Sequence, residues 1–558
     1  MEQRLIYYGF ITIFIIIILF ELNSSLSIIS LQNTFNTDFE TDNIPFHKDY
    51  RTLVIYFLVL STASFILFFH SWLQQLKYKQ AKLFTHSTFS NFNYSWLKYE
   101  WHLFQSVTFS CLDVIKVSLL FAINIWIWLN TTVNTYKGLE ERHLYLQSLA
   151  NGSAQLAVIN VAFAVMLAAR LSIIQRYFFG FDQTIRWHAW FGRLGCLQAL
   201  YHATFQIQYK YDQTQSFVST LSFNFRHVTG TCMLVAMITF ILGSHPLVRY
   251  LSYRLFRITH LVSFISLIML GCLHHWSFYV FYIIVLLFWV TDQIERTYKV
   301  KVGSLEALPA NIIRLRCELP YDTSQIQAGQ FVFISFQSSS IVKAVIFSHP
   351  FSICRIDENN QATFYIRANG RDTKGVYRIA ERSSSQRETP FLLRISKPVG
   401  RGYVRYPGSG FSDYKTVVLV AEGMGITPWI SLMHYLERKR HAIKTRSVHV
   451  IWSIHSIDTF YAFEQEFEYL VTSLQIDFHM EVYITGPFDP EENVSIPDNL
   501  TSIRFIASCR PHYHQLFKHI DENNQSNIAL GICAHEESIV KASNLALGLS
   551  WAIRKERF

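Results

Sequence analysis

Long runs of apolar residues occupy the first half of the chain and alternate with short polar segments. Each run is about 20 residues long, enough for a helix to cross the hydrocarbon core of a bilayer. The runs lie near residues 5–26, 52–72, 105–129, 152–175, 187–207, 228–246, 257–275 and 277–294. This pattern predicts eight membrane-spanning helices. The first run has a signal peptide as its alternative, but its MEQR flank is weakly basic and no clear cleavage site follows, which favours a membrane anchor.

Basic residues follow every second apolar run. They are Lys77, Lys79 and Lys82 after the second run, Arg176 and Arg186 after the fourth, Arg249, Arg254 and Arg257 after the sixth, and Arg296, Lys299 and Lys301 after the eighth. Because cytosolic loops carry the excess of Lys and Arg, these segments and both termini are predicted to be cytosolic. We expect an integral membrane protein of the plasma membrane or the endoplasmic reticulum, and this pattern does not choose between the two.

The pattern changes twice in the second half of the chain. From about residue 297 the hydropathy falls and the alternation typical of strands begins, as in NIIRLRCEL and AGQFVFISF. Near residue 413 a buried strand, a glycine turn and a helix follow one another in KTVVLVAEGMGITPWISLMHYLERK. We therefore expect two N-terminal spans with a cytosolic loop at 1–100, a six-helix core at 101–296, a β-rich domain at 297–410 and an α/β nucleotide-binding domain at 411–558.

Composition supports the membrane class. Half of the 558 residues are hydrophobic and only 16% are charged, which is unusual for a soluble protein. The net charge of +9 suggests nucleic acid, but the Lys and Arg residues flank the apolar runs, so we expect no nucleic-acid partner. The eight cysteines are scattered and form no CxxC pair, which argues against a zinc site or a disulfide scaffold.

Four histidines repeat one spacing on two of the predicted spans. His188 and His202 are 14 residues apart, and so are His260 and His274. Fourteen helical residues make nearly four turns, so each pair shares one face of its helix and spans about 21 Å. The two helices are two spans apart and run parallel, so the histidines meet at two levels, each able to hold one haem iron. The alternative is interhelical hydrogen bonding or proton relay, but four histidines in register favour two b-type haems.

These paired histidines resemble the membrane core of the ferric reductase and NADPH oxidase superfamily. The resemblance covers about 105–558, and it is greatest to short yeast members described as probable metalloreductases or as a yeast NADPH oxidase. It implies a multi-span α-helical membrane haem core, a ferredoxin-reductase-like FAD-binding β-barrel and an α/β NADP-binding domain. The two spans before residue 100 are extra to the six-helix core of the family.

The resemblance implies an FAD site in the β-rich domain. The family uses the strand HPFSI to seat the flavin, which here comprises His349, Pro350, Phe351 and Ser352. Downstream, Arg367, Lys374 and Gly375 offer basic groups and exposed backbone N–H to the FAD pyrophosphate, with a basic surface loop as the alternative.

A nucleotide site is expected at the second pattern change. Gly423 and Gly425 stand at a strand-to-helix turn, where the helix N-terminus favours a dinucleotide phosphate. With Ile426, Thr427 and Pro428 they resemble the NADPH motif of the family. Two departures bear on affinity and specificity. Glu422 stands where relatives usually have glycine, and His455 stands where they commonly have an Arg for the 2′-phosphate. The choice between NADPH and NADH therefore stays open.

Two further positions carry roles implied by the resemblance. Cys533 matches the nicotinamide-side cysteine of the family, although Ala534 and His535 replace the usual Gly-Pro, and the chain ends at Phe558 as in relatives whose terminal aromatic residue covers the flavin. A small buried cysteine and a frayed terminus are the alternatives.

The expected activity is transfer of electrons from cytosolic NADPH through FAD and two haems to an acceptor across the membrane. A hydride carries two electrons and a haem iron accepts one, so FAD divides them. Electrons would pass from an inner haem at His188 and His260 to an outer haem at His202 and His274. We expect a ferric or cupric reductase acting on a metal chelate, because Gln206 stands where the oxidase branch often has another histidine.

The alternatives come from two other classes. A superoxide-generating oxidase with oxygen as acceptor is favoured by the short segment 27–51, which has no cysteine. An inactive membrane scaffold is supported only by the departures at Glu422, His455 and His535.

Overall fold

The computed structural model describes most of the chain after residue 99. The described ranges are 100–104, 107–136, 142–169, 181–275, 277–295, 298–324, 326–336, 348–383, 392–400, 402–403, 410–439, 441–473, 476–487, 502–507, 509–524 and 527–556. The two spans predicted near 5–26 and 52–72, and the terminal Phe558, lie outside them.

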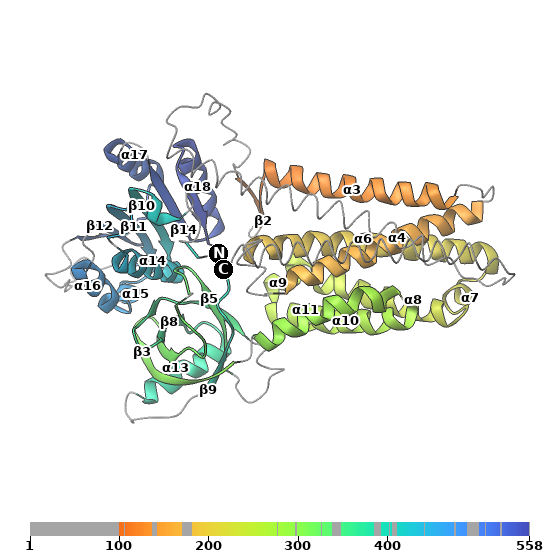
Figure 1. The fold of residues 1–558 in the computed structure, drawn as a ribbon, viewed down its shortest axis with the longest axis horizontal. Coiled ribbons are helices and arrows are strands. Elements are labelled where there is room, and N and C mark those ends of the chain that lie inside the picture. The colour runs from red at the N-terminus through yellow and green to blue at the C-terminus, as the bar shows by residue number, and fades with distance from the viewer. Residues whose placement is uncertain are drawn as a thin grey trace.

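An elongated bundle of helices forms one half of the described molecule (Figure 1). Its long helices are Cys111–Tyr136 (α3), Arg142–Ala168 (α4), Phe181–Thr214 (α6), Phe225–Gly243 (α8), Tyr253–His274 (α10) and Ser277–Glu295 (α11). Two short helices, Phe217–Leu221 (α7) and Pro246–Leu251 (α9), connect them at opposite ends. By length and composition, Leu146–Ala168, Phe225–Gly243 and Tyr253–His274 qualify as membrane spans among the described residues.

Two details of the predicted spans are wrong. The span expected at 105–129 begins instead with a hairpin of Glu100–Phe104 (β1) and Val107–Ser110 (β2), and α3 starts only at Cys111. The helix expected at 187–207 instead runs over 34 residues from Phe181 to Thr214, about 50 Å.

Apolar and polar residues are distributed in the bundle as a bilayer requires. Large apolar side chains such as Val235, Val262 and Leu287 are more than half exposed on its outer surface. Polar side chains are buried inside it, where Asn160 donates to Asn124 Oδ1 at 2.8 Å and to Gln198 Oε1 at 2.7 Å. These amides join α3, α4 and α6, because polar groups in an apolar medium associate through hydrogen bonds.

A seven-stranded antiparallel barrel follows the bundle, with α13 (Arg371–Ser383) packed on it. Its strand order is β6-β5-β9-β3-β4-β8-β7. The strands are Tyr298–Leu308 (β3), Ile312–Glu318 (β4), Phe331–Ser335 (β5), His349–Ser352 (β6), Arg355–Ile356 (β7), Gln361–Arg367 (β8) and Leu392–Ile395 (β9). Alternate residues such as Ile313, Leu315 and Phe364 fill its core.

A parallel six-stranded sheet completes the fold, in the order β13-β12-β11-β10-β14-β15. Its strands are Thr416–Glu422 (β10), Ser447–Ile454 (β11), Asp477–Ile484 (β12), Ile503–Ala507 (β13), Ile528–Cys533 (β14) and Ala552–Lys555 (β15). The helices on the sheet include Thr427–Arg438 (α14), Asp458–Tyr461 (α15), Glu464–Ser473 (α16), Tyr513–Asn524 (α17) and Glu536–Gly548 (α18). The strand order reverses between β10 and β14, and a ligand crevice is expected at the carboxyl ends of these two strands.

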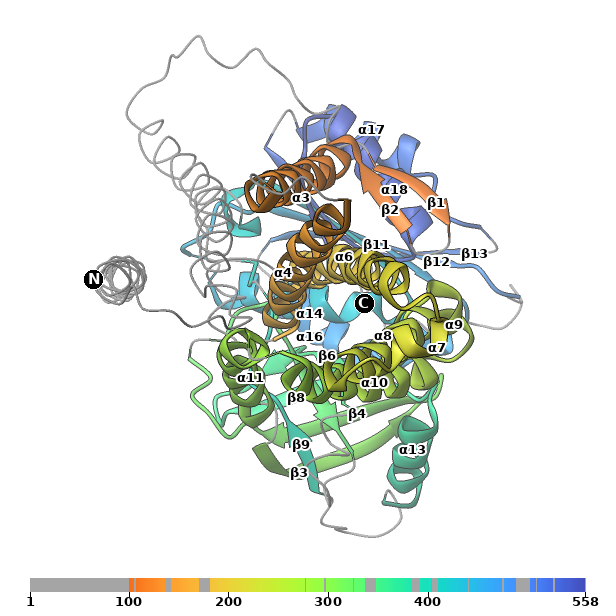
Figure 2. The ribbon, with the colours of Figure 1, turned by 90° about the vertical axis from the view of Figure 1, so that its right-hand side faces the viewer.

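The barrel and the parallel sheet lie together at one end of the bundle (Figure 1). We call this the proximal end of the bundle. The distal end comprises α7 and the helix ends near Thr214, Phe225 and His274, and Figure 2 looks along the bundle from that side. The predicted order of a helical membrane core, a β-barrel and an α/β domain is confirmed.

Candidate functional site

The four predicted histidines face one another in two pairs inside the bundle. The ring centres of His188 on α6 and His260 on α10 are 6.1 Å apart, with an angle of 61° between the ring planes. The ring centres of His202 and His274 are 6.4 Å apart, at 80°. The first pair is proximal and the second distal, because α6 and α10 both run away from the barrel and the sheet.

These separations fit a metal ion between two imidazoles. Metal–nitrogen bonds of about 2 Å on either side of an iron would hold the two ring centres about 6 Å apart. The ring-centre distances of both pairs are close to this value, and each pair joins the same two helices.

Each of the four rings is oriented through its Nδ1 atom. His188 Nδ1 donates to the Ala164 carbonyl at 2.7 Å, and His202 Nδ1 donates to the Ala150 carbonyl at 2.8 Å. His274 Nδ1 donates to the Arg226 carbonyl at 2.9 Å and lies 3.1 Å from Thr229 Oγ1, while His260 Nδ1 lies 2.9 Å from Ser244 Oγ. A carbonyl can only accept, so the ring proton of three histidines is on Nδ1 and the lone pair for a metal is on Nε2.

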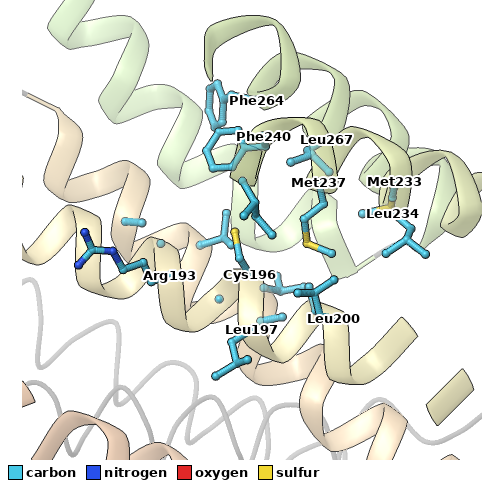
Figure 3. A pocket seen from close by; sticks show the side chains of 18 of the residues that line it. Arg193, Cys196, Leu197, Leu200, Met233, Leu234, Met237, Phe240, Phe264 and Leu267 are labelled. Atoms are coloured by element: carbon cyan, nitrogen blue, oxygen red, sulfur yellow. The ribbon is translucent and has the colours of Figure 1, made fainter. Parts of the chain in front are cut away.

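A cavity of about 1790 Å³ connects the two pairs. It exceeds the 300–1,000 Å³ typical of a single small-ligand site, as two stacked macrocycles require. Between the two histidine levels its wall is largely apolar, formed by side chains that Figure 3 labels: Cys196, Leu200, Met237, Phe240, Phe264 and Leu267. The described residues that line it include Arg193, Arg226, Arg249 and Arg257 but no Asp or Glu.

The glycines near the histidines serve close helix packing. A Cβ on Gly195 would lie 2.8 Å from Val161 Cγ2, and one on Gly271 would lie 2.6 Å from the Phe278 ring. This geometry supports tight contact of α6 with α4 and of α10 with Phe278. The Arg193 guanidinium lies 4.8 Å from the centre of the Trp190 ring.

The predicted flavin strand lies next to the proximal histidine pair. Arg257, one turn before His260 on α10, donates to the Ser348 carbonyl at 3.5 Å, directly before β6. Burial and the nearby Arg257 lower the pKa of His349, with Asp372 opposing them. In β6, Pro350 is exposed, Phe351 is half-buried and Ser352 is buried. This strand joins the barrel to the end of the helix that holds the proximal pair.

The other residues predicted to contact FAD lie on two elements. Arg367 ends β8, and its Nη1 would be 4.0 Å from a Cβ on Gly423, across the boundary between barrel and sheet. Lys374 and Gly375 are exposed on α13. The structure therefore brings Arg367 close to the nucleotide turn.

The predicted nucleotide turn occupies the crevice between β10 and β14. Gly423 has φ +52, a backbone conformation that favours glycine. A Cβ on Gly425 would lie 2.1 Å from the Cys533 carbonyl oxygen and 3.1 Å from its sulfur, so only glycine allows this approach. The turn continues through Ile426 into α14, which begins at Thr427 with Pro428 in its first turn. Gly425 and Cys533, separated by more than 100 residues, thus meet where the topology predicts a ligand.

The structure shows the contacts of Glu422 and His455, the two residues of the nucleotide site that depart from the family pattern. The Glu422 carboxylate accepts hydrogen bonds from the His535 N–H at 2.9 Å and from Ser538 Oγ at 2.6 Å, so it caps the N-terminus of α18. His455 is exposed directly after β11, and its carbonyl accepts from the Gly486 N–H at 3.0 Å. The sequence marks Glu422 as a missing glycine, and its capping role is visible only in three dimensions.

A buried polar network between the barrel and the α/β unit was not predicted. Tyr365 Oη on β8 donates to Glu466 Oε1 at 3.0 Å, and His434 Nε2 lies 2.8 Å from Glu466 Oε2. Burial raises the pKa of Glu466, but hydrogen bonds from His434 and Tyr365 and the charge of Arg355 outweigh it and lower that pKa overall. No motif connects these residues in sequence, so no sequence signal identifies the network.

Family comparisons match both halves of the chain. Residues 153–272 match the family model described as the ferric reductase like transmembrane component, and residues 414–546 match the ferric reductase NAD binding domain. The first range contains His188, His202 and His260 and ends two residues before His274, and the second contains the turn and Cys533.

Similar proteins differ in their stated activity. The chain is 20% identical over 362 residues to a superoxide-generating NADPH oxidase heavy chain of Dictyostelium discoideum, covering 57% of this chain and 50% of the relative. It is 24% identical over 365 residues to the ferric/cupric reductase transmembrane component 2 of Saccharomyces cerevisiae, covering 61% and 48%. The chain thus spans half or less of the length of these relatives.

A solved ferredoxin NADP+ reductase from Neisseria gonorrhoeae with bound FAD and NADP aligns with 47% of this chain and 98% of its own. The sequence identity is 14% and the TM-score is 0.34.

Proposed function

Because the chain belongs to the ferric reductase and NADPH oxidase superfamily, we propose that it is a metalloreductase. In this proposal it transfers electrons from NADPH through FAD and two b-type haems to a ferric or cupric ion. Membership of the family supports transfer of electrons from NADPH across a membrane, and the experiment below tests the metal acceptor.

The observation that carries the proposal is the pairing of the histidines. The ring centres are 6.1 Å apart in one pair and 6.4 Å apart in the other, at two levels of one cavity, and carbonyl acceptors hold Nδ1 of three of the four rings. Hydrogen-bonding or proton-relay histidines do not require two such levels. In this proposal His188 and His260 hold the inner haem, and His202 and His274 hold the outer one.

The other residues bind and align the remaining groups. When bound, FAD accepts two electrons as a hydride and releases them singly, which suits haem irons that accept one electron each. Residues His349 to Ser352 seat the flavin beside Arg257, and Arg367, Lys374 and Gly375 contribute to binding its pyrophosphate. The turn from Gly423 to Pro428 would bind the nucleotide phosphates, and by the family resemblance His455 would serve the ribose side of the nucleotide and Cys533 the nicotinamide side. The family resemblance implies that Phe558 would cover the flavin.

A metal acceptor is favoured by the outer end of the cavity. Gln206 lines the cavity one turn beyond His202, where an oxidase would often place a histidine. The second candidate is a superoxide-generating oxidase, because the Dictyostelium relative named for that activity is similar to this chain over 362 residues, about as many as the 365 residues matched by the yeast reductase. We further propose that both termini are cytosolic and that the membrane is the plasma membrane or the endoplasmic reticulum.

The purified protein provides the test. We expect a low-spin bis-histidine spectrum with two haems per chain, and loss of haem signal after His188→Ala together with His202→Ala. NADPH should drive reduction of a metal chelate without oxygen. Metal reduction that needs oxygen, or that superoxide dismutase abolishes, would assign the protein to the oxidase class instead.

A further inference from the structure

The distal end of the cavity carries positive charge. Its lining includes Gln206, Arg226, His227 and His275, all close to the distal pair of His202 and His274. Arg226 lies next to that pair, since its carbonyl accepts from His274 Nδ1 at 2.9 Å. The Arg226 side chain is exposed, and it is not needed for this hydrogen bond, which involves only the main chain.

A second cation lies beside the same opening. Lys210 Nζ lies 4.3 Å from the centre of the Phe223 ring, and that ring packs edge-on against His227 at 5.6 Å. The nearest acidic residue in the sequence, Asp212, is the single carboxylate between 206 and 231 and is not part of the cavity lining. Arg226 is therefore the charged side chain among the described lining residues at this end, and Lys210 lies beside that lining.

His227 presents a free ring nitrogen at this opening. Its Nδ1 lies 2.7 Å from Asn224 Oδ1 and donates to it, which orients the ring. Its Nε2 is buried and has no hydrogen-bond partner among the described residues. A polar atom of this kind is expected to meet a ligand or a solvent molecule.

We propose that the acceptor reaches this opening as an anion, namely a ferric or cupric ion held in an anionic chelate. This inference rests on the proposed metalloreductase function. A bare trivalent or divalent cation prefers carboxylate ligands, whereas the described lining of the cavity has none and contains Arg226 instead. A cationic entrance with low-dielectric walls attracts anions and accelerates their encounter. Arg226 is thus the specificity-determining residue of the acceptor site, and Lys210 supports it.

The overall reaction balances with two chelates for each nucleotide. One NADPH and two ferric chelates give NADP⁺, one proton and two ferrous chelates. Each chelate gains one electron, and no bond of the chelate needs to break.

The test compares acceptors of opposite charge in the full-length protein. NADPH-driven reduction is measured anaerobically with ferric-EDTA and ferricyanide as anions and with hexaammineruthenium(III) as the cation. Arg226→Gln should raise KM for both anions by about tenfold and leave that for the cation unchanged or lower. Arg226→Lys should restore most of the loss. Lys518→Gln removes one positive charge on α17, far from the opening, and should change none of the three values.

Each outcome supports or overturns the inference. If Arg226→Gln changes KM by the same factor for the anions and for the cation, the inference is overturned. Loss of the outer haem signal in Arg226→Gln would also overturn it and assign Arg226 to haem binding. If that variant does not assemble, rising salt should lower kcat/KM of the wild type for ferric-EDTA only, and an equal response of the cation would overturn the inference. If NADPH reduces the haems of the wild-type protein but the protein reduces none of the metal complexes, the metalloreductase function itself would be refuted.

Discussion

Ser244→Ala should raise the midpoint potential of one haem and leave the other unchanged. Ser244 directly follows α8 as its C-cap residue, and its Oγ lies 2.9 Å from Nδ1 of His260. A hydrogen bond accepted from Nδ1–H makes the imidazole a better electron donor and stabilises the oxidised iron. Without this bond the iron proposed at His188 and His260 should be easier to reduce.

The magnitude follows from the single bond that is lost. A neutral hydrogen bond contributes about 0.5–1.5 kcal/mol net. In a one-electron couple about 1.4 kcal/mol corresponds to about 59 mV, so the expected rise is roughly 20–60 mV. The shift should be confined to the inner haem, because no other described axial histidine uses Ser244.

Thr229→Val is the matched control at the other level. Thr229 Oγ1 lies 3.1 Å from Nδ1 of His274, but this Nδ1 also donates to the Arg226 carbonyl at 2.9 Å and keeps that bond in the variant. The outer haem should therefore shift by less than the inner haem does in Ser244→Ala. A spectroelectrochemical titration that resolves two haem transitions measures both. Equal shifts of both haems in Ser244→Ala, or no shift, would refute the assignment of His260 as a ligand held by Ser244.

Three further outcomes are expected. Gly425→Ala should lower NADPH-driven haem reduction more than tenfold and destabilise the α/β unit by about 1–3 kcal/mol, since its methyl group would overlap the Cys533 carbonyl; an unchanged rate would contradict this. The pKa of Glu466 is lower in the folded protein than its ordinary value of 4.5, so Glu466 contributes fully to stability above pH 4.5 and this contribution is lost as the pH falls through the folded pKa. In thermal unfolding, Glu466→Gln should lower the free energy of unfolding at pH 7 by about 1.5–3 kcal/mol and should make stability depend less on pH in the acid range. His455→Arg should improve kcat/KM for NADPH relative to NADH, and an unchanged ratio would mean that another residue recognises the 2′-phosphate.

The sequence alone determined the features that depend on local periodicity. Helical geometry repeats every 3.6 residues, so a spacing of 14 places His188 and His202 on one face whatever surrounds the helix. The change from long apolar runs to strand alternation near residue 297 likewise follows from local pattern, and β3 begins at Tyr298. The glycine turn at Gly423 follows from the local order of a buried strand, two glycines and a helix, and the structure adds that Gly423 has a positive φ.

Tertiary structure alone decided which groups meet across long separations. The Nδ1 partner of His202 is a carbonyl 52 residues earlier, and Tyr365 meets Glu466 across 101 residues. Such contacts depend on how helices and sheets pack, which no local pattern encodes. The hairpin before α3 was missed for a related reason, since aromatic and apolar residues such as those of Glu100–Ser110 suit a strand as well as a membrane helix, and long-range packing selects between them.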